Sequence, residues 1–348
     1  MRAAVYSGIG QIDCREVPKP EIGENEALVR VKAAAVCGTD LRIFRNGHHH
    51  IEEGTERILG HELSGEICEV GSKVTRYRTG MKVGVASNVG CGVCRYCRMG
   101  KVHLCPEYIA VGITFDGGFA EYFRVDCKPL LQGNLIPFER PSFDEIALAE
   151  PLSCAVNALE SVGTAPGDTV LIVGAGPLGA MHLQLNRLAG ASLVMMADIS
   201  EARLELLRQF GPDVLVDTSK QDLREAVLEH TDGNGADVVI TACPAPEVQK
   251  LSVEIAAKLG RINFFGGLPK GKEMVCLNTN LIHYNGLVVT GTTGASLAHY
   301  EQAIDLIEHG KVNVRSIISR RFGIEQIAEA FEYALSGQGL KTILDFQS

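Results

Sequence analysis

From Asp168 onward, short apolar segments alternate with helical segments, and this alternation constrains the fold more than any other feature of the chain. Strands are predicted at 169–173, 193–197, 214–216, 237–240, 261–265 and 287–290, and helices from the turn after 173 through 188 and at 201–210, 222–230 and 247–259. Strands separated by helices pair in parallel through right-handed crossovers. The sequence therefore predicts an α/β fold with a doubly wound (Rossmann) sheet over residues 152–290.

A glycine motif connects the first of these strands to its helix. It reads Gly174-Ala175-Gly176-Pro177-Leu178-Gly179, a GxGxxG that permits a tight turn and presents unpaired helix N–H groups to a pyrophosphate. Asp198 follows at the end of the second strand, where a carboxylate binds ribose hydroxyls and repels a 2′-phosphate. We therefore expect NAD, rather than NADP, as the cofactor. The alternative is a turn that serves only helix packing, with Asp198 capping the next helix.

Other residues of this domain are candidates for cofactor contacts. Gly266 and Thr292 follow late strands, and the ligand crevice of such a sheet lies beyond the carboxyl ends of its strands. Both are therefore expected to line the nicotinamide, unless these segments are ordinary strand-to-helix turns. Arg203 is expected either to stack near the adenine or to be a surface charge of its helix.

The remainder of the chain has a different pattern of predicted secondary structure. Residues 1–135 read as short strands broken by Gly, Pro and Asn, with the clearest at 27–33, 65–70, 82–85 and 119–123. Beyond the α/β region, helices are predicted at 298–309 and 324–335, and a last strand at 341–345. The helical segment 142–163, which holds Pro151, is the expected crossover. We expect a β-rich catalytic domain made of 1–151 and 291–348.

Four cysteines are clustered at C-x2-C-x2-C-x7-C spacing, namely Cys91, Cys94, Cys97 and Cys105. Four soft thiolates suit tetrahedral zinc, and a closed sulfur shell leaves no position for a substrate, so a structural zinc is predicted. The alternatives are redox cysteines and a zinc module that grips nucleic acid through Arg95, Arg98 and Lys101.

The composition indicates which kinds of partner and which cellular compartment to expect. Lys and Arg total 33 against 42 for Asp and Glu, which argues against nucleic acid as a partner. Apolar runs stop far short of the roughly 20 residues of a membrane span, and the N-terminus lacks the pattern of a secretory signal. The 11 cysteines, an odd number, fit a reducing compartment. We expect a cytoplasmic protein with a small-molecule partner and no membrane association.

Several motifs in order along the chain make it resemble the zinc-dependent medium-chain dehydrogenases. They are Cys37-Gly38-Thr39-Asp40, Gly60-His61-Glu62-Leu63-Ser64-Gly65, the four-cysteine lobe, Asp116-Gly117-Gly118-Phe119-Ala120-Glu121-Tyr122, Glu150-Pro151-Leu152-Ser153 and the glycine turn. From spacing alone, a separated Cys or His is more often a packed core residue than a ligand. The resemblance implies a GroES-like catalytic domain and places the chain in the polyol and threonine dehydrogenase branch.

The resemblance also implies the catalytic residues. Cys37, His61 and Glu62 are expected to hold a catalytic zinc, and Glu150 either ligates it or holds its water. The expected reaction is hydride transfer between a secondary alcohol and NAD, with Thr39 first in the proton relay. Relatives often carry His three residues after Thr39, where this chain has Arg42, which cannot shuttle protons at neutral pH.

The expected substrate is a polyol or its ketose, and three alternatives stay open. The segment 37–47 together with His49 resembles galactitol-1-phosphate dehydrogenases, and a loop with Arg42, Arg45 and histidines 48–50 could bind a phosphate, unless its arginines only lie on an exposed helix face. L-Threonine 3-dehydrogenase also matches, although its aromatic-rich insert is absent. A non-catalytic zinc-bearing binding protein is the last alternative. Relatives suggest a homo-oligomer, a dimer or tetramer.

Overall fold

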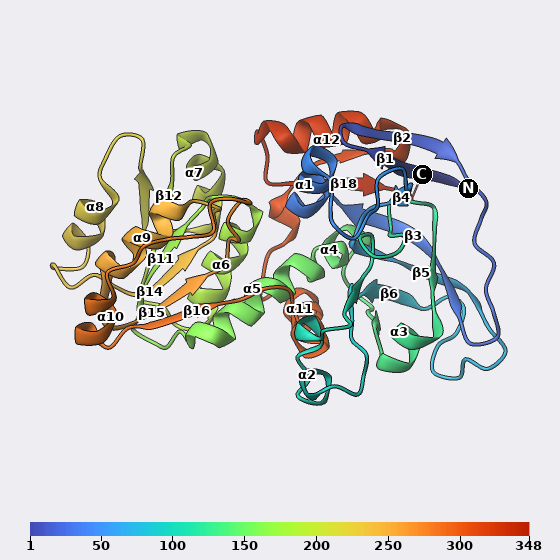
Figure 1. Cartoon of the computed structure of the whole chain (residues 1–348), viewed down its shortest axis with the longest axis horizontal. Coiled ribbons are helices and arrows are strands. Elements are labelled where there is room, and N and C mark those ends of the chain that lie inside the picture. Colours follow the sequence, from blue (N-terminus) through green and yellow to red (C-terminus); the bar gives the residue numbers. More distant parts are fainter. Residues whose placement is uncertain (348) are drawn as a thin grey trace. The chain divides into compact units, whose positions relative to one another are not determined.

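A computed structural model describes residues 1–347, which divide into two compact units. The first unit comprises Met1–Ser153 and the residues from Gly294 onward, and the second comprises Cys154–Thr293 (Figure 1). The boundaries expected from sequence, at 151/152 and 290/291, lie close to these positions.

The second unit is built on a six-stranded parallel sheet. Its strands lie in the order β13-β12-β11-β14-β15-β16, with two mononucleotide-type halves that meet at β11 and β14. Their bounds are β11 Thr169–Val173, β12 Leu193–Asp198, β13 Val214–Asp217, β14 Ala236–Thr241, β15 Ala256–Phe264 and β16 Val288–Gly291. The predicted doubly wound fold is confirmed.

Helices cover both faces of this sheet. They are α6 Pro177–Leu188, α7 Glu201–Leu207 with the short η2 Arg208–Phe210, α8 Leu223–Glu229, α9 Pro246–Ile255 and α10 Thr279–Asn285. Figure 1 shows α6 on one side of the sheet and α8 and α9 on the other. The helix predicted over 247–259 is wrong at its end, because α9 stops at Ile255 and the chain is extended from Ala256. Leu259, with φ of 62°, then adopts a left-handed conformation that a helix cannot contain.

The first unit contains a larger, mostly antiparallel sheet, ordered β10-β6-β5-β3-β18-β17, with β9 also paired to β3. Its strands are β3 Ala27–Ala35, β5 Glu62–Val70, β6 Lys82–Val85, β9 Tyr122–Val125, β10 Leu135–Pro137, β17 Ile318–Phe322 and β18 Lys341–Asp345. A second sheet contains β1 Arg2–Gly8, β2 Gln11–Glu16 and β4 Arg57–Ile58. The strand expected at 119–123 begins instead at Tyr122, because Phe119 is buried and its N–H bonds the Leu59 carbonyl.

The first unit also contains helices. They are α1 Gly38–Asn46, α3 Cys127–Gln132, α4 Phe143–Ala147, α11 Leu297–Glu308 and α12 Ile327–Ser336, preceded by η4 Ile324–Gln326, with a further turn, η3, at Arg315–Ile317. The helix α5 Ala149–Val162 begins in the first unit and continues into the second. One apolar core runs through the unit and includes Val31, Leu63, Phe119 and Phe331. No helix within residues 1–347 combines the length and apolar character needed to cross a membrane.

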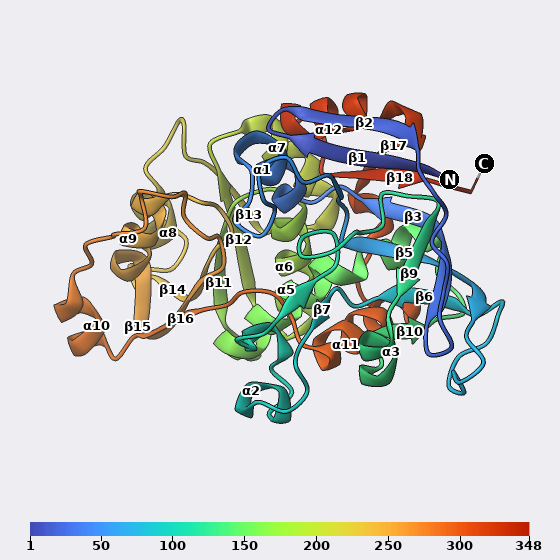
Figure 2. The same cartoon turned by 45° about the vertical axis from the view of Figure 1, so that its right-hand side comes forward.

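A small lobe protrudes from the first unit (Figure 2). It consists of β7 Asn88–Val89, α2 Arg95–Arg98, η1 Val102–Leu104 and β8 Ile109–Ala110. Neither α2 nor η1 contains a buried residue. The buried apolar residues of the lobe lie in its two strands, Val89 in β7 and Ala110 in β8. The helical part, which carries the cysteines, therefore has little apolar core.

Candidate active site

Strand register brings three distant segments to one edge of the large sheet. Ala35 of β3 is directly opposite Glu62 of β5 on one side and Ile343 of β18 on the other. Because both neighbours run antiparallel to β3, Cys37, two residues beyond Ala35, lies at the level of Lys341, two residues before Ile343. This edge therefore collects a thiol, a carboxylate and an ammonium group from segments far apart in sequence.

Cys37 is held at the N-terminus of α1, where it is the N-cap residue. Its sulfur accepts a hydrogen bond from the Thr39 N–H at 3.4 Å, and the buried Asp40 carboxylate accepts one from the Cys37 N–H at 2.9 Å. This reciprocal arrangement is a capping box. The sequence Cys-Gly-Thr-Asp thus fixes the position of the sulfur.

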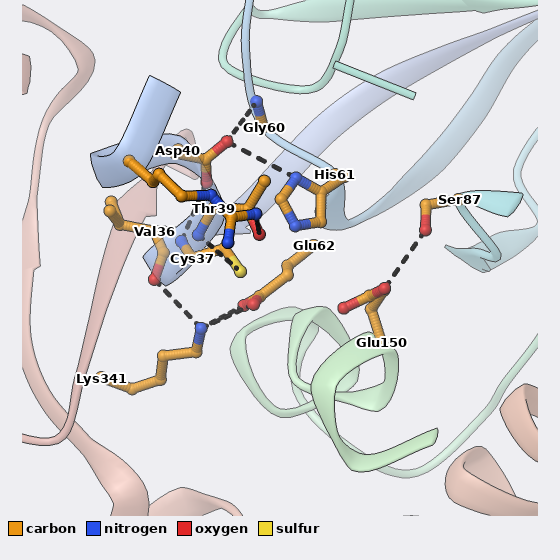
Figure 3. A network of polar contacts seen from close by, with 11 residues as sticks. Val36, Cys37, Thr39, Asp40, Gly60, His61, Glu62, Ser87, Glu150 and Lys341 are labelled. Carbon is orange, nitrogen blue, oxygen red and sulfur yellow. Dashed lines mark hydrogen bonds and ion pairs between the residues drawn. The ribbon is translucent and has the colours of Figure 1, made fainter. Parts of the chain in front are cut away.

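His61 is oriented by the same aspartate. Its Nδ1 lies 3.4 Å from Asp40 Oδ1, which also accepts a hydrogen bond from the Gly60 N–H at 3.3 Å. Figure 3 shows the other ring nitrogen of His61 facing Cys37 and Glu62. Burial alone would lower the pKa of His61, but Asp40 and Cys37 raise it well above the ordinary value. In metal sites, a carboxylate next to the second ring nitrogen of a ligating histidine usually fixes the orientation of its imidazole.

Only glycine fits immediately before His61. Gly60 has φ of +93°, and a Cβ added there would lie 2.3 Å from the ring of Phe119. The GHE motif therefore has a packing reason for its glycine, and the backbone turn delivers His61 and Glu62 to the same site.

The ligand atoms of Cys37, His61 and Glu62 all lie within 4.8 Å of one another. His61 and Glu62 are buried, with exposures of 7% and 0%, and Cys37 is half-buried. One thiolate, one imidazole and one carboxylate form a donor set that zinc accepts, and three protein ligands leave a fourth position for a substrate. The residues therefore fit a catalytic zinc ion.

Lys341 is a member of this site that the sequence did not indicate. Its Nζ donates hydrogen bonds to Glu62 Oε1 at 2.6 Å and to the Val36 carbonyl at 3.0 Å, and it lies 2.5 Å from Glu62 Oε2 (Figure 3). Burial lowers the pKa of Lys341, but Glu62 and Cys37 more than offset this and raise it. A lysine that starts a C-terminal strand carries no motif, so only the register of β18 against β3 reveals it.

Glu150, in the first turn of α5, is not within the set of three ligands. Its Oε1 accepts a hydrogen bond from Ser87 Oγ at 3.3 Å, and the residue is only 8% exposed. Burial and the Glu62 carboxylate raise the pKa of Glu150, whereas His61, Lys341 and Ser87 lower it, and the result is a pKa of about 6. A carboxyl group with such a pKa can hold or release a proton near neutral pH.

Thr39 and Arg42 lie on the same face of α1. The Arg42 Nη2 donates a hydrogen bond to Thr39 Oγ1 at 3.5 Å, and Arg42 is otherwise exposed. Within residues 1–347, no ion pair joins Arg42 to a carboxylate. The threonine hydroxyl therefore has a permanent cation, rather than a titratable imidazole, as its neighbour.

The four-cysteine lobe forms a second cluster. The sulfurs of Cys91, Cys94, Cys97 and Cys105 lie within 4.8 Å of one another. Backbone N–H groups of this loop donate to three of these sulfurs: Cys91 N–H to Cys105, Cys94 N–H to Cys91 and Cys97 N–H to Cys94. The N–H groups of Val93 and Cys94 lower the pKa of Cys91 to about 7. A four-sulfur set with backbone donors fits tetrahedral structural zinc.

The glycine turn and Asp198 are joined by hydrogen bonds. Asp198 Oδ2 accepts from the Ala175 N–H at 2.7 Å, and Oδ1 accepts from the Ser200 N–H at 2.9 Å. Gly174 has φ of +122°, and a Cβ on Gly179 would lie 2.0 Å from the Gly174 carbonyl oxygen. Pro177 is the first residue of α6, with Gly176 as its N-cap and Leu178 next. This arrangement leaves the helix N-terminus accessible and fixes a carboxylate beside it.

The other expected cofactor residues lie at the same ends of the strands. A Cβ on Gly266 would lie 2.5 Å from the Cys243 carbonyl oxygen, and Thr292 Oγ1 donates to Asn263 Oδ1 at 3.1 Å. Both residues follow parallel strands, β15 and β16. Arg203 is half-buried in the first turn of α7, and its N–H donates to Ser200 Oγ at 3.4 Å.

Family models match both parts of the chain. The alcohol dehydrogenase GroES-like domain matches residues 23–134, and the zinc-binding dehydrogenase model matches residues 177–309. The first match contains Cys37, His61 and Glu62 together with the four-cysteine lobe.

Individual proteins are similar over nearly the whole chain. An L-threonine 3-dehydrogenase from Symbiobacterium thermophilum is 36% identical over 334 residues, 95% of this chain and 93% of that protein. A Sinorhizobium meliloti 1021 protein, described as a putative zinc-binding dehydrogenase and solved bound to NADP, has a TM-score of 0.91 at 30% identity, covering 99% of this chain and 98% of that one. Galactitol-1-phosphate dehydrogenase from Escherichia coli has a TM-score of 0.88 at 26% identity, covering 99% and 100%.

Proposed function

Because the chain belongs to the zinc-binding dehydrogenases with an alcohol dehydrogenase GroES-like domain, it is an oxidoreductase, and we propose that it transfers a hydride between a secondary alcohol of a polyol, or its ketose, and NAD. The observation that carries the proposal is the set formed by half-buried Cys37 with buried His61 and Glu62, in which Asp40 Oδ1 lies 3.4 Å from His61 Nδ1. A protein that used this fold only for binding would have no need of such a set.

Each residue has a defined task in this proposal. Bound zinc supplies a Lewis acid that favours the ionised form of the substrate alcohol, and NAD supplies the hydride acceptor. Asp40 holds His61 Nδ1, so Nε2 is available as a ligand atom. The Thr39 hydroxyl would accept the proton of the alcohol as it releases its own, and its Arg42 neighbour, which stays protonated, cannot receive the released proton. Glu150, with a pKa of about 6, is the nearby group that can hold a proton.

Cofactor choice gives a direct prediction for Asp198. The fixed carboxylate would repel a 2′-phosphate, so kcat/KM for NAD should exceed that for NADP by at least about a hundredfold. Asp198→Ala should reduce this ratio, chiefly through the KM for each cofactor, measured by steady-state kinetics. Asp198→Asn is the matched variant, since it keeps an acceptor for the Ala175 N–H and removes only the charge. Equal use of both cofactors by the parent enzyme would contradict the assignment.

A phosphorylated or otherwise anionic substrate is the second candidate. Arg42 is bonded to Thr39 and has no carboxylate partner among the described residues, so it can bind an anionic group beside the site. Burial, together with the neighbouring His49, His50 and Arg42, lowers the pKa of nearby His48 to about 4. The curated L-threonine 3-dehydrogenase similarity is compatible with this candidate, because threonine carries a carboxylate.

Kinetics on matched substrates tests these candidates. NAD reduction should be measured with sorbitol and its phosphates, galactitol and galactitol 1-phosphate, L-threonine and a simple secondary alcohol. The polyol proposal expects the unphosphorylated polyols to react best. If a phosphate raises kcat/KM by more than about tenfold, and Arg42→Ala but not Arg45→Ala removes the gain, the second candidate holds. If only L-threonine or the simple alcohol reacts, the polyol proposal fails.

A homo-oligomer and a cytoplasmic location remain predictions. Light scattering on the purified protein would give the number of chains in the assembly.

A further inference from the structure

The first unit contains a cavity of about 430 Å³ that the proposed function does not use. Small-molecule sites in proteins usually enclose roughly 300–1,000 Å³ and have mostly apolar walls with a few polar groups. The apolar part of this wall is formed by Val5, Val17, Pro18, Ile58, Phe115 and Phe123. None of the described residues that line the cavity belongs to either metal cluster or to the glycine turn. The cavity therefore has the size and lining of a small-molecule site separate from the metal centres.

Arg57, in β4, is the charged residue of this wall that is short of hydrogen-bond partners. Its side chain is only 16% exposed. Among residues 1–347, its guanidinium makes one hydrogen bond, from Nη1 to Asp116 Oδ1 at 3.5 Å, and its Nε is buried without a partner. A guanidinium has five N–H donors, and burial of a charge without matching acceptors costs free energy. A ligand that brings acceptors to Arg57 would reduce this cost.

The other charged side chains of the wall are better satisfied. Two carboxylates form ion pairs, Glu56 with Arg15 at 2.6 Å and Asp126 with Arg124 at 3.0 Å. Asp116 accepts a hydrogen bond from the Ile58 N–H at 3.1 Å, and its side chain is 61% exposed, so water shares its charge. Because three carboxylates line the same cavity, a ligand with one negative charge fits better than a phosphate with two.

Aromatic side chains line the same cavity. The rings of Phe115 and Phe123 are nearly parallel, with 22° between their planes and 6.5 Å between their centroids. Tyr122 also lines the cavity, and the Lys19 ammonium group lies 4.6 Å from its ring centroid. Aromatic walls pack well against a flat apolar ring, and a guanidinium can bind a carboxylate through two parallel hydrogen bonds. The wall thus combines the two features that recognise an aromatic acid.

We infer that this cavity is a second ligand site, which binds a small aromatic carboxylic acid in its ionised form. The carboxylate binds Arg57, and the ring packs against Phe115 and Phe123. Binding gives the guanidinium the acceptors that it lacks within the chain, and charge-assisted hydrogen bonds of this kind are stronger than neutral ones. Since no metal ligand or cofactor residue takes part, the inference goes beyond the proposed function and does not depend on it.

Isothermal titration calorimetry tests the inference with 3-phenylpropionate and with 3-phenyl-1-propanol, which has the same ring and chain but no charge. The acid should bind the parent with a Kd of about 1 mM or below, at least about tenfold more tightly than the alcohol. Arg57→Gln should remove this preference. Arg124→Gln is the matched control, because it removes an exposed arginine of the same wall and should keep the preference within about twofold of the parent.

Three results would overturn the inference: equal binding of the acid and the alcohol, no binding of either, or a preference that persists in Arg57→Gln. Val17→Trp provides a second test if Arg57→Gln folds poorly. It fills the cavity from a half-buried position without removing a charge, so it should weaken binding of the acid by at least about tenfold. Unchanged binding in this variant would place the acid elsewhere on the protein and would also contradict the inference.

Discussion

Cys37→Ser is expected to lower kcat/KM by more than about a hundredfold, because loss of even a group that only supports a metal ligand costs 10- to 100-fold. The zinc content should fall from about two to about one per chain, measured by mass spectrometry on protein purified without chelator. The fold should survive. Cys37 is the N-cap of α1, and serine is among the best N-cap residues, so the bond from the Thr39 N–H can be kept.

Cys276→Ser is the matched control for this change. Cys276 is an exposed free cysteine outside both cysteine-containing clusters, so its replacement should alter neither zinc content nor turnover. A parent enzyme with a single zinc equivalent that persists in Cys37→Ser would show that the Cys37 site is not a zinc site.

The doubly wound unit was predictable because its signals are local. Continuous apolar runs such as 169–173 and 193–197 reappear as β11 and β12, and the glycine turn falls between β11 and α6. The secondary-structure prediction failed at elements whose conformation is determined by tertiary contacts. The end of α9 depends on the left-handed backbone at Leu259, and β17, with two arginines in five residues, has no strand-like alternation of its own. It is a strand because it pairs with β18.

The residues of the candidate sites also differ in how far local sequence could identify them. The four cysteines of the lobe were grouped from spacing alone, because all their ligands lie in one short segment. Cys37, His61 and Glu62 could be grouped only through the family resemblance, since strand register brings them together. Lys341 was missed altogether, because its partner Glu62 is 279 positions away and a single lysine has no sequence signature. Its position next to Glu62 becomes evident only from the pairing of β18 with β3.

We expect the lobe around the four cysteines to depend on a bound metal more than on packing. It contains the two-residue strands β7 and β8, the four-residue α2 and the three-residue η1. Val93, Met99 and Leu104 are 76%, 64% and 46% exposed, so its larger apolar side chains contribute little core. Cys105 is the one buried cysteine of the four. Elements this short do not persist without a cross-link or a metal.

Cys97→Ser should therefore open the lobe while the rest of the first unit stays folded. One zinc equivalent should be lost, and trypsin should cut at Arg95, Arg98 or Lys101 at least about tenfold faster, because local opening exposes backbone that the metal holds closed. Cys127→Ser, in α3 outside both metal clusters, is the matched control and should leave the cleavage rate near that of the parent. Circular dichroism should show most secondary structure retained, since the large sheet does not use these thiols. If zinc content and cleavage rate both match the parent, the four thiols do not hold a structural metal, and packing alone must order the lobe.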